Sequence, residues 1–190
     1  MRNLLKITVT LFAFSLAAAQ ADASGNVAGQ LTAQLTLQGG CMVSGAQGSG
    51  SGTNFGTLDF GIQPSTFTGV LLATASGGAG GAGPTRIVCS PEVNSMSISV
   101  SAGNNAGQGG SVGTGSRAMK LGSSSFLPYE IYSDAGLVTA YSTSSNAVGV
   151  VLPGTGAAFD LPIYGRVNKT NAGAMPAGTY TDLLQVTLSW

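Results

Sequence analysis

The sequence has no histidine and very little charge. Seven lysine or arginine residues and seven aspartate or glutamate residues make up 7% of its 190 positions, whereas globular proteins average about 25%. The charges cancel, so the chain offers no electrostatic footprint for nucleic acid or acidic lipid. Without histidine, it also lacks the general base of a serine hydrolase triad. The composition therefore disfavours nucleic-acid binding and the commonest hydrolytic chemistry.

Two strings resemble catalytic motifs but lack the context that the chemistry requires. Gly109-Gly-Ser-Val-Gly113 matches a nucleophile elbow, yet the chain has no histidine to activate the serine. Gly78-x-Gly-x-x-Gly83 matches a dinucleotide fingerprint, yet it lies in a glycine tract with no βαβ pattern around it. The few acids suggest solvated roles, not a catalytic pair: Asp22, Asp59, Glu92, Glu130, Asp134, Asp160 and Asp182. We therefore predict a protein that is not an enzyme and uses no cofactor or small-molecule substrate.

The only long apolar run lies at the start of the chain. Arg2 and Lys6 precede the run from Ile7 to Ala19, which falls short of the ~20 residues that a membrane-spanning helix needs. Small residues follow at the spacing of a cleavage site. Residues 1–23 are therefore predicted to be a secretory signal peptide, cleaved after Ala21 or Ala23, with a retained membrane anchor as the alternative.

Two cysteines, Cys41 and Cys89, remain in the predicted mature chain. An even count in an exported protein suggests one disulfide. A zinc site is disfavoured because the chain has no histidine and no Cys-x-x-Cys spacing. We therefore predict a Cys41–Cys89 disulfide and no metal.

Short alternating runs separated by glycine-rich turns predict strands throughout the chain. Ser95–Ser101 alternates with Met96, Ile98 and Val100 on one face, and Leu127, Tyr129 and Ile131 also share a face. Glycine, with 30 residues, clusters between such runs, and no helical pattern stands out. This pattern predicts one all-β domain, either a sandwich or a barrel.

The clearest alternation lies near the two ends of the chain. One row of the N-terminal segment 27–37 consists of Val27, Gly29, Leu31, Ala33, Leu35 and Leu37. One row of the C-terminal segment consists of Tyr180, Leu184, Val186, Leu188 and Trp190, and it runs to the last residue. Each is the period-two pattern of a half-buried strand.

The pairing partners of these two segments have several interpretations. In one interpretation they pair within one chain as an ordinary first and last strand, and in another they belong to a small outer-membrane β-barrel. The short strands argue against a barrel, whose lipid-facing strands need about nine to eleven residues. The remaining interpretation is a fibre subunit whose sheet is completed by another chain through β-strand addition.

Six motifs in order carry a resemblance to a known family. They are Gly40-Cys-x-Val43, Phe55-Gly-Thr-Leu-Asp-Phe-Gly61, Ile87-Val-Cys89, Tyr129-x-Ile-Tyr-x-Asp134, Leu161-Pro-Ile-Tyr-Gly-Arg166 and Ala177-Gly-x-Tyr-x-Asp-x-Leu-x-Val-Thr-x-x-Trp190. Together they resemble the spore coat protein U domain family, which includes subunits of archaic (Csu-type) chaperone–usher pili. The glycine-rich stretches 45–52 and 77–83 depart from the pattern, but only in predicted loops.

The resemblance implies an immunoglobulin-like β-sandwich that lacks its last strand. In that family a periplasmic chaperone fills the groove, and at the outer-membrane usher the N-terminal extension of the next subunit replaces it. Residues 24–40 would then be the donor extension, with the Val27–Leu37 row as donor strand, and 41–190 the pilin-like domain. The C-terminal row from Tyr180 to Trp190 would line the acceptor groove.

The implied role is a structural subunit of a surface fibre, exported through the periplasm and contributing to attachment and biofilm. A secreted spore- or cell-coat protein of the same fold is the alternative. The implied partners are a periplasmic chaperone, an outer-membrane usher and other copies or related pilus subunits.

Overall fold

The computed structural model describes residues 25–44, 52–144 and 146–190. The predicted signal peptide, residues 1–23, lies outside the described residues. The chain divides into two units, one that ends at Thr36 and one that spans Leu37–Trp190. Each unit is described by itself below.

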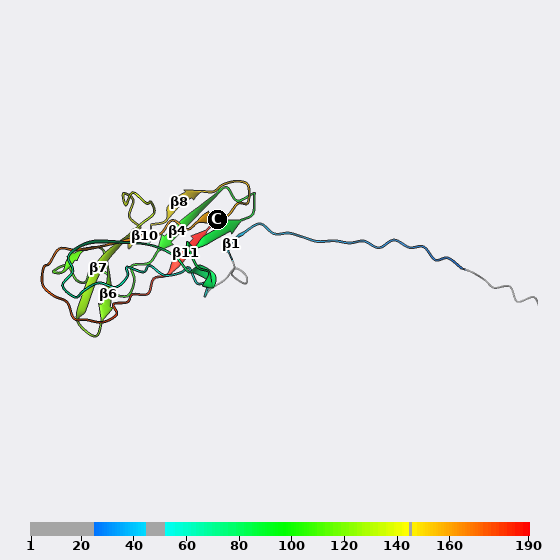
Figure 1. Cartoon of the computed structure of the whole chain (residues 1–190). Coiled ribbons are helices and arrows are strands. Elements are labelled where there is room, and N and C mark those ends of the chain that lie inside the picture. The colour runs from blue at the N-terminus through cyan, green and yellow to red at the C-terminus, as the bar shows by residue number, and fades with distance from the viewer. Residues whose placement is uncertain (1–24, 45–51, 145) are drawn as a thin grey trace, which may run out of the picture. The chain divides into compact units, whose positions relative to one another are not determined.

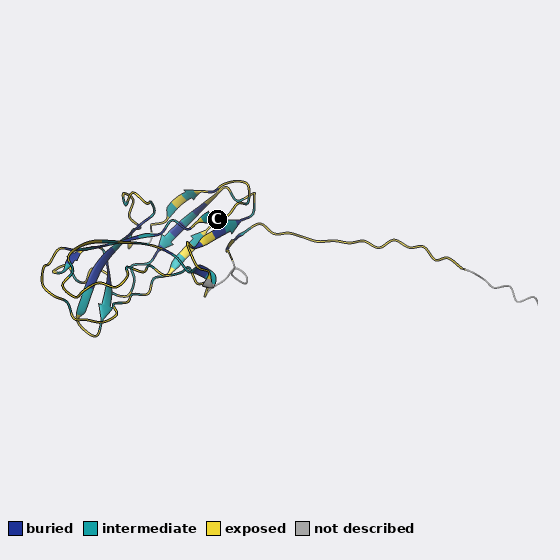
Figure 2. Ribbon diagram, in the orientation of Figure 1, coloured by how far each residue is buried: buried dark blue, intermediate teal, exposed yellow. Residues whose placement is uncertain are grey.

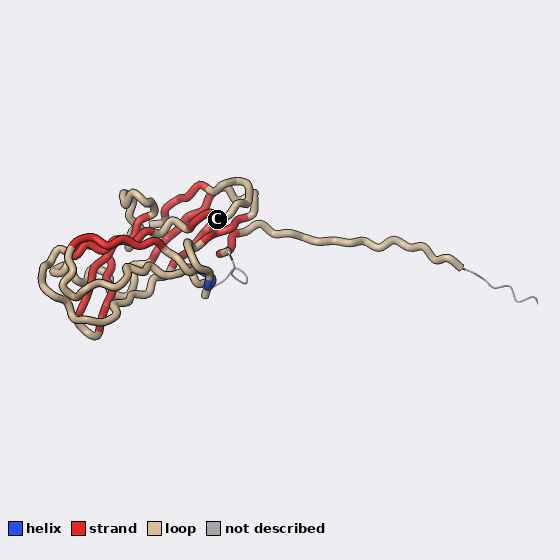
Figure 3. The backbone as a smooth tube through the Cα atoms, in the orientation of Figure 1, coloured by secondary structure: helices blue, strands red, loops and turns tan. Residues whose placement is uncertain are grey.

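The described part of the first unit, residues 25–36, contains no strand or helix (Figure 3). Its side chains are exposed throughout (Figure 2), including the apolar ones, and Leu31 is 96% exposed. The apolar row that the sequence predicted is therefore exposed on a segment without regular secondary structure. Such a row is costly in water unless a partner covers it.

The second unit is built almost entirely of strands. The described residues form β1 (Cys41–Val43), β2 (Gly69–Thr74), β3 (Arg86–Cys89), β4 (Ser95–Val100), β5 (Gly113–Thr114), β6 (Arg117–Leu121), β7 (Ser125–Tyr132), β8 (Val148–Val151), β9 (Phe159–Asp160), β10 (Tyr164–Lys169) and β11 (Val186–Ser189), with one 3-10 turn at Gly78–Gly80. No helix of the described residues is long and apolar enough to cross a membrane.

The strands form three antiparallel sheets. Their orders are β1-β3-β9, then β2-β10-β7-β6 with β5 beside β10, and β11-β4-β8. Figure 1 shows β6 and β7 toward one end of the domain and β4, β8 and β11 toward the other. Because each order has two ends, every sheet formed by the described residues is open at its edges.

The inner faces of these sheets enclose one apolar core. Met96, Ile98 and Val100 on β4 are buried, and so are Leu127, Tyr129 and Ile131 on β7, as their alternation predicted. Residues that follow or precede strands, such as Leu161 and Ile163, complete the same cluster. The prediction of an all-β sandwich is confirmed; its immunoglobulin-like topology and its completion by another chain remain proposals.

A wholly buried arginine joins two of the sheets. Arg117 on β6 donates to the carbonyl oxygens of Val100 and Ser101 at the end of β4, at 3.0 and 2.8 Å. It also donates to the carbonyl oxygen of Tyr141 at 3.1 Å and pairs with the Glu130 carboxylate at 2.9 Å. Burial lowers the pKa of the guanidinium, and the charge of Glu130 opposes that shift. The network ties β6 to the end of β4, because a buried cation needs its full set of acceptors.

The predicted disulfide is confirmed. Cys41 on β1 lies directly opposite Cys89 on β3, and their sulfur atoms are bonded. The bond therefore fixes the register of a short strand that contributes only three residues to its sheet.

Replacing both cysteines with alanine is expected to lower the free energy of unfolding by about 4 kcal/mol. The bridge joins residues 48 positions apart, and the entropy of closing a loop of that length in the unfolded chain sets this figure. Urea denaturation of the double variant and the oxidised parent measures the difference. A change below about 1 kcal/mol would contradict the expectation.

Candidate functional site

The C-terminal segment changes sheets along its length. At Thr181 it forms a two-way backbone bridge with Lys120 on β6, at 2.9 and 3.1 Å. From Val186 onward it runs as β11 beside β4. Residues 182–184 lie in neither ladder, so a space opens where the segment leaves one sheet for the other.

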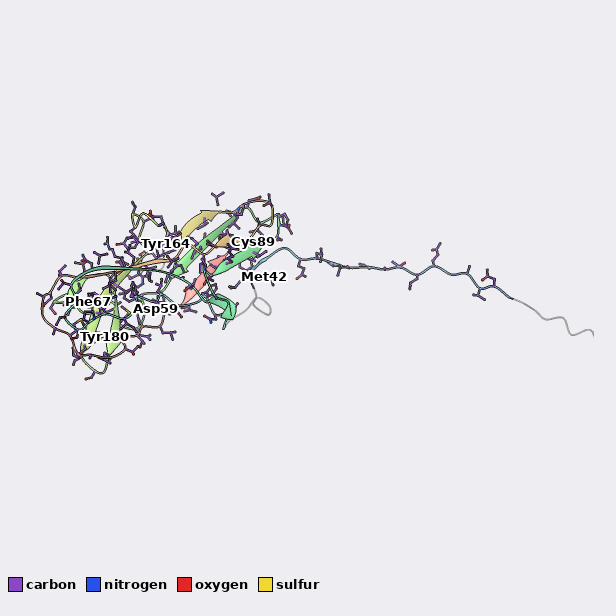
Figure 4. All side chains as sticks on the ribbon, viewed as in Figure 1. Met42, Asp59, Phe67, Cys89, Tyr164 and Tyr180 are labelled. Atoms are coloured by element: carbon purple, nitrogen blue, oxygen red, sulfur yellow. A yellow bond between two sulfur atoms is a disulfide. The ribbon has the colours of Figure 1, made fainter. Side chains whose placement is uncertain are left out.

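Side chains of this segment alternate as the sequence predicted. Leu184, Val186 and Leu188 are half-buried and pack on the core, whereas Gln185, Thr187 and Ser189 are exposed. Tyr180 also packs on the core, near the β6 and β7 end of the domain (Figure 4). Trp190 is 54% exposed and its ring lies beside Gly40.

The segment Phe55–Gly61, one of the six motifs, faces the C-terminal segment. Thr57 bridges Ser76 through two backbone hydrogen bonds, and the Thr85 hydroxyl donates to the Phe55 carbonyl oxygen at 2.8 Å. Phe60 packs edge-on against the Tyr129 ring, with centroids 6.2 Å apart.

The close approach of this motif to the sheet depends on a glycine. Gly165 on β10 admits it, because a Cβ at that position would lie 2.8 Å from Phe60 and 3.3 Å from Leu58. These two side chains therefore pack directly over the β10 backbone.

A cleft of about 1030 Å³ lies between the two segments. One wall includes Phe55, Leu58 and Phe60, and the other includes Tyr180, Leu184 and Val186. Further apolar side chains line it, among them Val100, Met119, Tyr129 and Ile163. The cleft thus brings together three of the residues that were predicted to line the acceptor groove, Tyr180, Leu184 and Val186. The other two, Leu188 and Trp190, are not part of its lining.

The outer edge of β11 is open within the described residues. Gln185 accepts a hydrogen bond from the Ser101 backbone N–H at 2.9 Å, which marks those residues as a hydrogen-bonded pair of the ladder. Since such pairs alternate along antiparallel strands, the backbone groups of Val186 and Leu188 face away from β4. The site therefore combines an apolar cleft with unpaired strand backbone, the two features that an added strand requires.

One carboxylate holds the segment where it changes sheets. Asp182 accepts hydrogen bonds from the Tyr129 hydroxyl at 2.8 Å and from the backbone N–H groups of Asn104 and Leu183 at 2.9 and 3.0 Å. Gly103, at φ 73°, is required beside it, since a Cβ there would lie 2.1 Å from a carboxylate oxygen.

The buried hydroxyl of Tyr129 stays protonated and remains a hydrogen-bond donor to Asp182. Burial, together with the hydrogen bond to Asp182, raises the pKa of Tyr129 far above its usual value. The sequence suggested a solvated role for Asp182, and this structural role was missed. The signal was present in the spacing Tyr180-x-Asp182-x-Leu184, which keeps the acid between two apolar wall residues.

The fold and cleft together define an all-β sandwich domain with an open strand edge. Comparison with protein families goes further: the chain belongs to the spore coat protein U domain family, whose model matches residues 27–187. It is 28% identical over 161 residues to Protein U of Myxococcus xanthus, a match that covers 84% of this chain and 86% of that protein.

Among solved structures, the chain matches one in the CsuC–CsuE chaperone–tip adhesion subunit pre-assembly complex from the archaic chaperone–usher Csu pili of Acinetobacter baumannii. The identity is 19% and the TM-score 0.43, with 82% of this chain covered. The chain spans 40% of the length of the matched chain.

Replacing Asp182 with alanine is expected to destabilise the fold by about 2–3 kcal/mol, because the buried Tyr129 hydroxyl then loses its acceptor. A double-mutant cycle with Tyr129→Phe isolates this one hydrogen bond, and urea denaturation should give a coupling energy of about 1.5–3 kcal/mol. Strictly additive effects of the two substitutions would show that the bond contributes nothing.

Proposed function

We propose that this protein is a structural subunit of a secreted surface fibre of the chaperone–usher type. The segment Val27–Leu37 of one copy would fill the cleft of the next. The observation that supports this most directly is that the chain carries both halves of such a joint. One is an exposed alternating apolar segment, and the other is an apolar cleft beside an open strand edge.

The donor half has the composition that such a joint requires. Val27, Leu31 and Leu35 are exposed, with Gly29 and Ala33 between them on the same row. Burying each large side chain stabilises by roughly 1.5–3 kcal/mol, and pairing with the open edge adds backbone hydrogen bonds. The segment carries no charge from Gly25 to Met42, so it enters an apolar cleft without burying an ion.

The acceptor half is the cleft together with the edge of β11. Tyr180, Leu184 and Val186 would contact the donor within the cleft, and we propose that Leu188 and Trp190 extend the same surface along β11. Without a donor, an open apolar edge of this kind invites aggregation.

The partners and location proposed are those that the motif resemblance implies. A signal peptide of residues 1–23 would deliver the chain to the periplasm. There a chaperone would cover the cleft until an outer-membrane usher adds the subunit to the fibre on the cell surface. Residues 24–40 would serve as the extension and 41–190 as the pilin-like domain. The role would be structural and not enzymatic, contributing to attachment and biofilm.

A secreted spore- or cell-coat protein is the second candidate. The description of the family to which the chain belongs, the spore coat protein U domain, supports it. The two candidates differ in their need for a chaperone. A pilus subunit expressed in a periplasm without its chaperone should aggregate or be degraded, whereas a coat protein should be recovered as a stable, folded monomer. Solubility, yield and β-content by circular dichroism distinguish the two outcomes.

The donor segment is tested by single charges placed on its two faces. Leu31→Asp or Leu35→Asp should abolish polymerisation while chaperone binding persists, because an aspartate cannot enter the cleft without burying its charge. Gln34→Asp, which places the same charge on the opposite row, is the matched control and should polymerise normally. Electron microscopy and non-denaturing electrophoresis read out the fibres. Normal assembly of both leucine variants would locate the donor elsewhere.

A further inference from the structure

The wall of the cleft contains a sulfur atom. Met119 on β6 lines the cleft together with Tyr180 and Leu184. Its side chain is partly buried against the core, and in the ladder with β7 it lies directly opposite the buried Leu127. A thioether is apolar, so it suits a wall that an apolar donor would contact. Unlike an aliphatic side chain, however, it becomes polar when an oxidant converts it to a sulfoxide.

Met119 is on the inward face of an edge strand. It lies two residues after Arg117, so the two side chains share one face of β6. Arg117 reaches from that face to the end of β4 and is wholly buried. Met119 is less covered, and the next residue, Lys120, forms the bridge to Thr181 from which the C-terminal segment leaves β6. The thioether therefore faces the interior but is open through the cleft.

Thiols do not compete for an oxidant in this chain. Its two cysteines, Cys41 and Cys89, are bonded to each other, and a disulfide has no thiolate to be oxidised. The methionines are therefore its most readily oxidised sulfur groups. Those of the predicted mature chain are Met42, Met96, Met119 and Met175.

These four methionines differ in exposure and in place. Met96 is buried, at 3% exposure, whereas Met42 is 44% exposed. Met119 and Met175 are both partly buried against the core, but of the two only Met119 is among the described residues that line the cleft. Figure 4 shows Met42 toward the β1 end of the domain, away from Tyr180. The chain thus carries its own controls for a reaction at Met119.

We propose that Met119 is a modification site at which a hydroperoxide, such as hydrogen peroxide, closes the cleft to the donor segment. The sulfur lone pair attacks one peroxide oxygen, an S–O bond forms and the O–O bond breaks. The departing hydroxide takes the proton of the transferred oxygen and leaves as water. Sulfur is thereby oxidised by two electrons and the peroxide is reduced by two. Methionine sulfoxide reductases, supplied with a dithiol, reverse the change.

This inference rests on the proposed function, because the donor is what the sulfoxide excludes. A sulfoxide oxygen is a strong hydrogen-bond acceptor and is hydrated in an open cleft. The donor row from Val27 to Leu37 contains only glycine and aliphatic side chains, so it offers no side-chain donor in exchange for that water. A donor already in place would in turn cover Met119. Unassembled copies are therefore sensitive to peroxide, and assembled copies are protected.

The rate of oxidation at each methionine tests the accessibility of the site. The mature chain with Leu31→Asp, which should not polymerise, is treated with hydrogen peroxide and its peptides are followed by mass spectrometry. Met119 should be oxidised several-fold faster than Met96. A synthetic peptide of residues 24–40 should then slow the reaction at Met119 several-fold and leave that at Met175 unchanged. Equal rates at Met119 and Met96 would overturn the proposal whatever the peptide does.

Binding of the same peptide, carrying a fluorophore, tests the consequence. In the Leu31→Asp protein, peroxide should weaken peptide binding by about tenfold, because a polar group is buried without a partner. Each variant is compared with itself before and after treatment. Met119→Leu should show no loss on treatment, whereas Met175→Leu, the matched control, should lose affinity as the parent does. An equal loss in both variants would overturn the proposal.

The two proposals fail in different ways in this experiment. Failure of the untreated protein to bind the peptide would contradict the donor joint itself and, with it, this inference. Binding of equal strength before and after complete oxidation of Met119 would overturn only the role of Met119 and leave the donor joint supported.

A substitution that needs no oxidant guards against damage elsewhere in the chain. Met119→Gln places a polar group of similar length in the cleft wall and should weaken peptide binding by about tenfold without peroxide. Met175→Gln, outside the cleft, is the matched control and should leave binding unchanged. Circular dichroism checks that both variants keep their β-content. Equal affinities of the two glutamine variants would overturn the proposal.

Discussion

The rest of this structure depends on the way the C-terminal segment pairs with two different sheets along different residues. The C-terminal segment pairs with β6 at Thr181 and with β4 from Gln185 onward. Between these points its backbone must be held by something else, and Asp182 supplies the acceptors. The cleft lies where the segment passes from β6 to β4. Its apolar wall residues pack on the core on one side and border this open space on the other, so they are only half-buried.

Charged groups are few in this protein, and two of them hold its sheets together through hydrogen bonds. Arg117 on β6 donates to the carbonyl oxygens of Val100 and Ser101 at the end of β4, so one buried cation joins strands of two different sheets. Asp182 does the same for the C-terminal segment and the loop that contains Asn104. A chain with 7% charge thus uses these charges to fix its architecture.

The low charge of the remaining surface has a consequence at the sheet edges. Most soluble proteins place charges beside open strands to prevent association. Here the edge of β11 presents backbone and aliphatic side chains instead. The exposed segment 25–36 has the same character. Each is unfavourable for an isolated monomer and suited to an assembly, because only a second chain removes the exposed apolar row from water.

Much of this organisation follows from the sequence alone. Period-two alternation identified the buried faces of β4 and β7, since the direction of side chains along a strand depends only on the parity of the residue number. The cysteine count determined the disulfide, and the alternation of residues 180–190 identified three residues of the cleft wall. The tertiary structure alone decided that Asp182 and Arg117 are anchors, that Phe55–Gly61 forms the facing wall, and that Trp190 lies outside the cleft beside Gly40. These depend on which distant strands become neighbours, and local alternation carries no information about pairing between segments separated by more than a hundred residues.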